Sequence, residues 1–488
     1  ATGTLLQRLP LTEADFRGTI LADHPVPLKG NNDLLCLTRP DIIASIHRQY
    51  LEAGADIIST SSFNANAISQ ADYGTASLVY DINVAAASIA KREAIAYSTP
   101  DRPRFACASI GPTGKTASIS PSADDPSARA VSFDELAEAY RTQVRGLLDG
   151  GIDILMVETI FDALNAKATL YAISQEFDAR GTAVPVMISA SVSGLGERLL
   201  TGQTIEAFCA AVSHAPHLLS IGLNCGLGAA QLAPVLRRLH AVAPCRISTH
   251  PNAGLPDGFG HYSQTPEQMS AELLPLLQAG LISIVGGCCG TTPEHIHALV
   301  TAIAQHRIPP AQKPTPHQTP AHFSGIEKLD IPSEPHPLVL VGERSNVAGS
   351  RRFLRLMKDR QYAEAVDIAR AQVVAGAHII DVNMDDPMLD SASAMRTFLN
   401  FSATEPILSN APVMVDSSDW NTVLAGLKCL QGRGIVNSIS LKDGPEKFVA
   451  KAQDVHRLGA AVLVMCFDEK GQADTCARRR EIADRSYR

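Results

Sequence analysis

The chain alternates between short apolar, β-branched runs and longer segments with helical periodicity. Runs of strand length occur in the first part of the chain at 55–63, 105–112, 152–159, 184–192, 218–225, 245–252 and 281–289. Amphipathic segments separate them, such as 132–151, which begins with a capping serine and ends with glycine. This alternation predicts a parallel sheet that is covered by helices on both faces.

Seven such strands, together with an incomplete strand at the N-terminus, indicate a (β/α)8 barrel over residues 1–305. Residues 306–337 are rich in proline and histidine and have no strand or helix period, so they are predicted to be a linker. Residues 338–488 resume the alternation, with apolar runs at 338–345, 378–383, 413–418, 435–440 and 461–468.

The second α/β unit has roughly 150 residues, against about 250 for a complete barrel. We therefore expect two successive (β/α)8 barrels of the TIM type. The first lacks part of its first strand, and the second is truncated after about five strands.

Composition and charge narrow the class of protein. An apolar content of 45% with 19% charged residues is typical of a soluble globular enzyme. The net charge of −8 and the lack of basic runs argue against nucleic acid as a partner.

There is no apolar stretch long enough to span a membrane and no leader sequence, so we expect no membrane partner and a cytoplasmic location. The chain does not begin with methionine, and we expect a fragment or one component of a larger system.

Three of the ten cysteines occupy predicted strand ends. Cys225 closes the run at 218–225, and the adjacent Cys288 and Cys289 close the run at 281–289 between glycines. Because the carboxyl ends of barrel strands share one rim, the three thiolates can meet, and three protein ligands with one open position are typical of catalytic zinc. The flanking glycines allow the sharp turn that this requires. Spacing alone leaves ordinary buried thiols open as the alternative, which we expect for the other seven cysteines.

Several motifs resemble one family in order along the chain. "GLNCGLG", "THPNAGLPDGFGHY" and "VGGCCGTTPEHI" in the first unit, and "VGERSNVAGSRRF", "DVNMDDPMLD" and "VDSSDW" in the second, resemble the N-terminal homocysteine- and folate-binding half of cobalamin-dependent methionine synthases. The resemblance implies Zn²⁺ on Cys225, Cys288 and Cys289, with Glu158 and Asn224 binding homocysteine. Glu158 could instead be a solvated strand end. The family's opening "DGAMGT" survives only as residues 1–4, which is why the first strand is expected to be incomplete.

In the second unit, the resemblance assigns folate binding to polar residues at or just beyond strand ends. Their carboxylate and amide groups can pair with the N–H and carbonyl edge of a pterin. The alternative is helix capping by Ser345, Asp416 and Asp443. The assigned residues are Glu343, Asn346, Gly349, Ser350, Arg351, Asp381, Asn383, Asp416, Asn437 and Asp468.

The implied enzyme transfers a methyl group from 5-methyltetrahydrofolate to homocysteine, with no catalytic residue assigned beyond the metal site. The methyl group passes through methylcobalamin, bound by a corrinoid module, in cis or in trans, that is not in this chain. A D-x-H-x-x-G match at 454–459 is predicted to lie in a helix with His456 on its surface, and so not to bind cobalt. Two alternatives stay open: a corrinoid-independent homocysteine S-methyltransferase with a regulatory pterin-binding domain, and a zinc-stabilised folate-storage protein without turnover.

Overall fold

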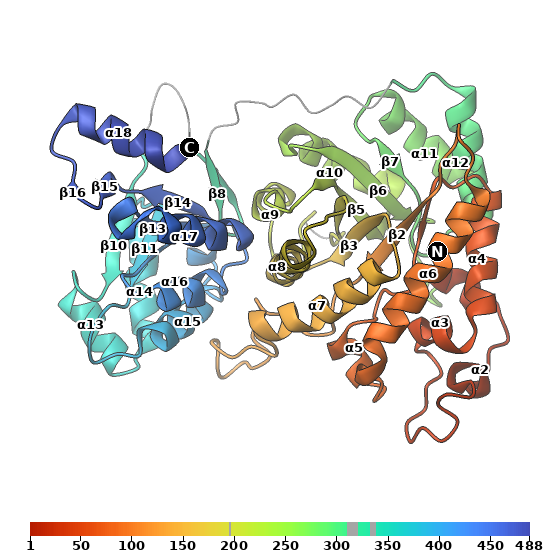
Figure 1. Cartoon of the computed structure of the whole chain (residues 1–488), viewed down its shortest axis with the longest axis horizontal. Helices are drawn as coiled ribbons and strands as arrows, with labels where there is room; N and C mark the ends of the chain where they lie inside the picture. The colour runs from red at the N-terminus through yellow and green to blue at the C-terminus, as the bar shows by residue number, and fades with distance from the viewer. Residues whose placement is uncertain (195–196, 310–320, 332–337) are drawn as a thin grey trace.

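The first domain is built on a seven-stranded parallel sheet (Figure 1). The computed structural model describes residues 1–194, 197–309, 321–331 and 338–488. The strands pair in chain order, and each apolar run predicted for this domain overlaps one of them. They are β1 (Ile57–Ser59), β2 (Phe105–Ile110), β3 (Ile154–Ile160), β4 (Val186–Ala190), β5 (Leu218–Gly228), β6 (Arg246–Asn252) and β7 (Ile284–Val285).

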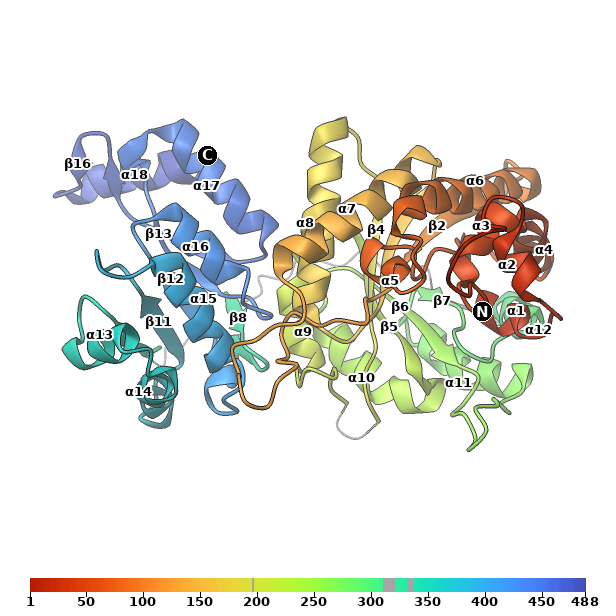
Figure 2. The same cartoon turned by 90° about the horizontal axis from the view of Figure 1, so that it is seen from below.

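Helices cover the outer face of this sheet, which curls into a half-barrel (Figures 1 and 2). Ser132 begins α7 as predicted, because its side chain accepts a hydrogen bond from the Glu135 backbone and Glu135 caps the serine in return. The other connections are helical too. The helices are α2 (Glu13–Arg17), α3 (Leu35–Thr38), α4 (Pro40–Glu52), α5 (Ala67–Ala71), α6 (Val79–Tyr97), α7 (Phe133–Asp149), α8 (Ala163–Arg180), α9 (Ile205–Val212), α10 (Ala229–Val242), α11 (Pro266–Gln278) and α12 (Pro293–Gln305).

The expected incomplete strand at the N-terminus is wrong, because these residues form helix α1 (Thr2–Leu6). Helical geometry places Leu5 and Leu6 in an apolar cluster with Leu28 and Leu34, which an extended chain would not bury together. The sheet is therefore edged by β1 and β7, and no pairing joins these two strands among the described residues. A closed eight-stranded barrel stays a prediction.

Part of the predicted linker is ordered, contrary to its lack of a strand pattern. β8 (His322–Ser324) and β9 (Lys328–Asp330) pair antiparallel. The turn between them is held from both sides, since Thr204 of the first domain donates its backbone N–H to Ile326 O (3.0 Å) and Ile326 N–H donates to Ser409 O (2.9 Å) of the second domain. Tertiary contacts therefore order this segment. The remaining predicted linker residues at 310–320 and 332–337 lie outside the described part of the chain.

The second domain has a five-stranded parallel sheet, and each of its strands overlaps one of the five predicted runs. These strands are β10 (Val341–Asn346), β11 (Ile379–Asn383), β12 (Val413–Asp416), β13 (Ile435–Ile439) and β14 (Ala461–Val464), followed by the small hairpin β15 (Phe467–Asp468) and β16 (Gly471–Gln472). The helices are α13 (Arg351–Lys358), α14 (Tyr362–Val374), α15 (Ser391–Ser402), α16 (Trp420–Leu427), α17 (Pro445–Arg457) and α18 (Cys476–Tyr487). The predicted position of the D-x-H-x-x-G match is confirmed, because its first four residues end α17 and His456 is exposed; that it does not bind cobalt stays a prediction. None of the helices in the described residues combines the length and apolar character needed to cross a bilayer.

The two domains are joined by a buried interface. Lys167 of α8 is only 1% exposed, and its ammonium donates to Leu430 O (2.8 Å) and Gly432 O (3.0 Å) after α16. Burial lowers the pKa of Lys167 to about 7. Around it, buried apolar residues of α9 and α17, including Phe208 and Val455, belong to one continuous core cluster.

Replacing Lys167 with methionine should destabilise the interface between the two domains. The substitution keeps most of the side-chain length but leaves two buried carbonyl oxygens without their donor, which costs about 1–3 kcal/mol. We expect a lower midpoint of chemical unfolding, with Lys447→Met, at an exposed position of α17, as the matched control. Equal midpoints for the two variants would show that the lysine does not stabilise the interface.

Candidate functional site

Three cysteine sulfurs meet at the carboxyl ends of the first sheet. Cys225 lies in the last part of β5, and Cys288 and Cys289 follow β7, with β6 between these strands. The three Sγ atoms lie within 4.8 Å of one another, and Cys225 Sγ is 3.7 Å from Cys289 Sγ. Four tetrahedral sulfur ligands at 2.3 Å from zinc would be about 3.8 Å apart. The donor set and its spacing therefore fit one zinc ion with an open fourth position.

The backbone around the adjacent pair explains why two neighbouring cysteines can face one point. Strand β6 and its end hold both residues, because Cys288 N–H donates to Pro251 O (2.8 Å) and Cys289 N–H donates to Asn252 Oδ1 (3.1 Å). Gly290 follows with φ +78°, and a Cβ atom there would lie 2.4 Å from Tyr262. Only glycine therefore fits this turn.

Cys225 itself has a left-handed backbone, with φ +58°, and is followed by Gly226 with φ +68°. A residue with a Cβ atom rarely adopts this conformation, and such strain is found mainly at functional positions. The turn departs from the strand direction at the residue that carries the sulfur. Strand β5 thereby aims Cys225 toward the pair that follows β7.

Hydrogen bonds among the three thiols shift their pKa values in opposite directions. Hydrogen bonds from Cys225 and then Cys288 lower the pKa of Cys289, whereas the interaction with Cys225 raises the pKa of Cys288. The group therefore favours one thiolate before any cation binds. No other His, Cys, Asp or Glu group in the described part of the chain has the spacing of a metal site. Cys36, Cys107 and Cys209 are buried as expected, whereas Cys476 is exposed at the start of α18.

Glu158 and Asn224, the predicted homocysteine ligands, lie together beside the cysteines. Burial raises the pKa of Glu158 to about 7, and its carboxylate accepts a hydrogen bond from Ser109 Oγ (2.5 Å). Asn224 Nδ2 donates to Glu158 Oε2 (3.3 Å) and Thr159 Oγ1 (2.7 Å), while Asn224 Oδ1 accepts from Thr159 N–H (2.9 Å) and Ser189 Oγ (2.7 Å). The amide of Asn224 is thus engaged by the protein and positions Glu158. Its direct contact with substrate stays a prediction.

Tyr262 is a site residue that the sequence reasoning did not single out. Its side chain hydrogen-bonds to Cys289 and contributes to the low pKa of that thiol, while burial and the neighbouring sulfur raise the pKa of Tyr262. The residue ends the quoted motif "THPNAGLPDGFGHY", so the resemblance marked its segment but not its role. Asn252 of the same motif was missed as well.

The second domain brings four of the predicted folate residues together near the ends of its strands, three of them at one level of the sheet. Asn383, Asp416 and Asn437 are paired in register on β11, β12 and β13. Asn383 Nδ2 donates to Asp416 Oδ2 (3.0 Å), and Asn437 Nδ2 donates to Asp381 Oδ2 (3.1 Å). Burial raises the pKa of Asp381 to about 6 and also raises that of Asp416. Two carboxylates and two amides therefore form a compact polar rim.

Other predicted folate residues surround this rim. Glu343 of β10 is exposed and is close enough to raise the pKa of Asp381 and Asp416. Asn346 Oδ1 accepts hydrogen bonds from Gly349 N–H (3.0 Å) and from the preceding backbone N–H, which folds the loop before α13.

The capping alternative fails at the three positions for which it was raised. Ser345 lies within β10, and the residues that precede α16 and α17 as N-caps are Asp419 and Gly444, not Asp416 and Asp443. Ser350, a predicted folate residue, does cap α13, and the exposed Arg351 follows it as the first residue of that helix.

Asp468 differs from the rest of the set. It is buried in β15, and its carboxylate accepts hydrogen bonds from the Arg478 guanidinium (2.5 Å) and the Lys470 backbone (2.9 Å). These bonds tie the hairpin to α18. A folate contact by Asp468 stays a prediction, and it would have to compete with this ion pair.

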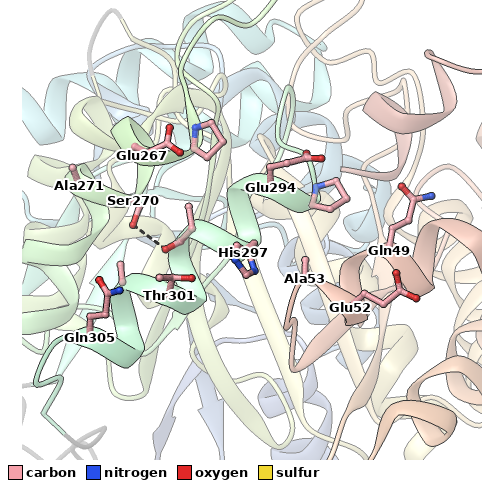
Figure 3. A pocket seen from close by; sticks show the side chains of 14 residues that line it. Gln49, Glu52, Ala53, Glu267, Ser270, Ala271, Glu294, His297, Thr301 and Gln305 are labelled. Carbon is pink, nitrogen blue, oxygen red and sulfur yellow. Dashed lines mark hydrogen bonds between the residues drawn. The ribbon is translucent and has the colours of Figure 1, made fainter.

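A cavity of about 760 Å³ lies elsewhere on the first domain, between α4, α11 and α12 (Figure 3). Glu52, Glu267, Glu294 and His297 are among the side chains that line it, and Ser270 Oγ donates to Ala298 O there (3.4 Å). None of the predicted site residues lines this cavity.

Comparisons with known proteins match each domain separately. Residues 1–303 match the family model described as homocysteine S-methyltransferase, and residues 342–488 match that of pterin binding enzymes. Solved structures of the homocysteine methyltransferase MmuM from Escherichia coli are similar to the first part. The metallated form has 22% identity and a TM-score of 0.47, and covers 62% of this chain and 93% of its own. The oxidized form has the same identity and coverage, with a TM-score of 0.48.

The cysteine group predicts a metal content that mutation can test. We expect one zinc per chain, lost in Cys288→Ala because two sulfurs hold the ion poorly, and retained in Cys36→Ala, whose thiol is buried away from the group. Atomic emission on the purified proteins measures this directly. Full zinc retention in Cys288→Ala would refute the assignment.

Proposed function

The chain belongs to the homocysteine S-methyltransferase family and carries a pterin-binding domain, and we propose that it transfers a methyl group from 5-methyltetrahydrofolate to homocysteine through a corrinoid carrier. The products are methionine and tetrahydrofolate. N5 of the folate loses the methyl group and gains a proton, while the homocysteine sulfur loses its proton and gains the methyl group. The observation that carries the proposal is the convergence of three cysteine sulfurs at one rim, in a chain whose other domain has a separate polar rim.

The proposal divides the chain into a homocysteine-binding zinc domain at 1–305, a linker at 306–337 and a pterin-binding domain at 338–488. Cys225, Cys288 and Cys289 would hold Zn²⁺, which when bound keeps the substrate sulfur deprotonated at neutral pH. A free thiol with a pKa near 8.5 is mostly protonated under these conditions.

Residues of the first domain orient homocysteine. The carboxylate of Glu158 lies beside the sulfurs and can accept the substrate ammonium, an interaction that also favours its ionised form despite burial. Ser109 and Asn224 hold that carboxylate in place by hydrogen bonds. Tyr262 interacts with the sulfur of Cys289. Together these groups place the substrate sulfur at the open position.

Residues of the second domain hold the pterin. Asp381 and Asp416 can accept hydrogen bonds from pterin N–H groups, and Asn383 and Asn437 can donate to its carbonyl and ring nitrogens. The proposed ligand set is the one predicted from the sequence, with Glu343, Asn346, Gly349, Ser350, Arg351 and Asp468 around these four. Because the two substrates bind in different domains, a carrier must connect them. We propose methylcobalamin on a corrinoid-binding module, in cis or in trans.

A second candidate is a corrinoid-independent homocysteine S-methyltransferase with a regulatory pterin-binding domain. It is favoured by one observation: the family match over residues 1–303 includes all three cysteines, so the first domain can contain a complete methyl-acceptor site. The methyl donor distinguishes the two functions.

An assay with two methyl donors tests the proposal. We expect this chain, loaded with zinc, to methylate homocysteine from added methylcobalamin, because free corrinoid can approach the open rim. With 5-methyltetrahydrofolate and no corrinoid, methionine formation should be weak or absent. Methionine formation from folate alone at the methylcobalamin rate would instead support the corrinoid-independent enzyme.

Replacing Asp416 with asparagine should weaken folate binding and leave homocysteine binding unchanged. The substitution removes a charged acceptor worth about 1.5–3 kcal/mol, which corresponds to a loss of about tenfold to a hundredfold in affinity. Titration calorimetry with each ligand measures the two affinities, and Asp474→Asn, at an exposed position, is the control. Equal losses for both ligands would indicate unfolding instead of a pterin contact.

A further inference from the structure

Asp385 is a half-buried acidic residue in the loop after β11, and it is not among the predicted pterin ligands. Its carboxylate accepts hydrogen bonds from Ser417 Oγ (2.5 Å), Ser418 N–H (2.7 Å) and Ser418 Oγ (2.8 Å). These two serines directly follow Asp416, the last residue of β12. Asp385 therefore connects the end of β12 to the end of β11.

The backbone of Asp385 orients a residue of the polar rim, Asn383. The Asp385 N–H donates to Asn383 Oδ1 (2.9 Å), and Asn383 Nδ2 donates to Asp416 Oδ2 (3.0 Å). If this amide were reversed, Nδ2 would face a second donor and Oδ1 would face a carboxylate oxygen, so both hydrogen bonds would be lost. The position of Asp385 therefore determines which end of the amide contacts Asp416.

Asp416 is thus held by its own side chain and by the two residues that follow it. Its Oδ2 accepts the hydrogen bond from Asn383, and in the described part of the chain no protein donor bonds to its Oδ1. A half-buried carboxylate oxygen without a protein donor favours a ligand that supplies an N–H group. In the proposed function that ligand is the pterin.

The charge of Asp385 is a second way in which it could act on Asp416. Burial, together with the charges of Asp385 and Glu343, raises the pKa of Asp416, whereas the hydrogen bond from Asn383 opposes this shift. Glu343 has the same charge and acts on the same group. The hydrogen bonds to Ser417 and Ser418, and not the charge, are therefore what distinguishes Asp385.

We propose that Asp385 is a positioning residue for the folate donor. It does not touch the pterin, and it holds Asp416 and Asn383 so that one oxygen of Asp416 stays free for a pterin N–H group. This inference rests on the proposed folate site.

Two substitutions of Asp385 test the inference, with 5-methyltetrahydrofolate binding to the full chain measured by titration calorimetry. Asp385→Ala removes the acceptor of Ser417 and Ser418, and we expect an affinity about tenfold lower. Asp385→Asn should bind within about twofold of the unmodified chain, because its Oδ1 can accept from Ser418 and its Nδ2 can donate to Ser417 Oγ, a hydroxyl that accepts as well as donates. The conservative variant thus restores binding without the charge.

The matched control is Asp419→Ala, in the same loop. Asp419 caps α16 through the backbone N–H groups of Asn421 and Thr422, and so it stabilises the domain without contacting the rim. We expect this variant to lower the midpoint of chemical unfolding at least as much as Asp385→Ala does, and to keep the folate affinity.

A double variant tests whether the effect passes through Asp416. In the Asp416→Asn background, Asp385→Ala should lower the remaining affinity by no more than about twofold. Unchanged affinity in Asp385→Ala, or an equal loss in Asp419→Ala, would overturn the positioning role, and so would an Asp385→Asn variant that binds as weakly as Asp385→Ala. Absence of binding by the unmodified chain would instead overturn the proposed folate site, and this inference with it.

Discussion

Two hydrogen bonds at the end of β6, accepted by the Pro251 carbonyl and the Asn252 side chain from the backbone N–H groups of Cys288 and Cys289, fix the geometry on which the first site depends. They hold Cys288 and Cys289 in a turn that no regular strand or helix provides. Cys225 then reaches the same point from the other neighbour of β6, through its own left-handed backbone. The middle strand therefore sets the distance between the sulfurs, and the spacing of three neighbouring parallel strands sets which residues can meet.

Much of this arrangement could be predicted from the sequence. Buried parallel strands are apolar throughout, so all twelve strands of the two main sheets were predicted from short apolar runs. Strand ends share a rim, so Cys225 could be placed with Cys288 and Cys289 across more than sixty residues of sequence. The polar rim of Asp381, Asn383, Asp416 and Asn437 follows from the same rule.

What the sequence did not predict depends on contacts between distant segments. The N-terminal residues form a helix because Leu5 and Leu6 find an apolar cluster, and the hairpin at 321–331 forms because both domains hold its turn. Asn224 uses its amide in hydrogen bonds to side chains of other strands, and Tyr262 contacts Cys289. These partners come from distant segments, so the spacing of residues along the sequence does not identify them.

The interface around Lys167 has a consequence for how the protein can be handled. The two domains share one apolar core that runs from α9 to α17, and a buried cation lies within it. If the chain were divided in the linker, each half would expose to water an apolar surface that is buried in the intact chain. The first half would also expose the Lys167 ammonium without its two carbonyl acceptors. Separately produced halves would therefore be prone to self-association. Dividing the protein for biochemical work would require the apolar residues of the domain interface to be replaced by polar ones.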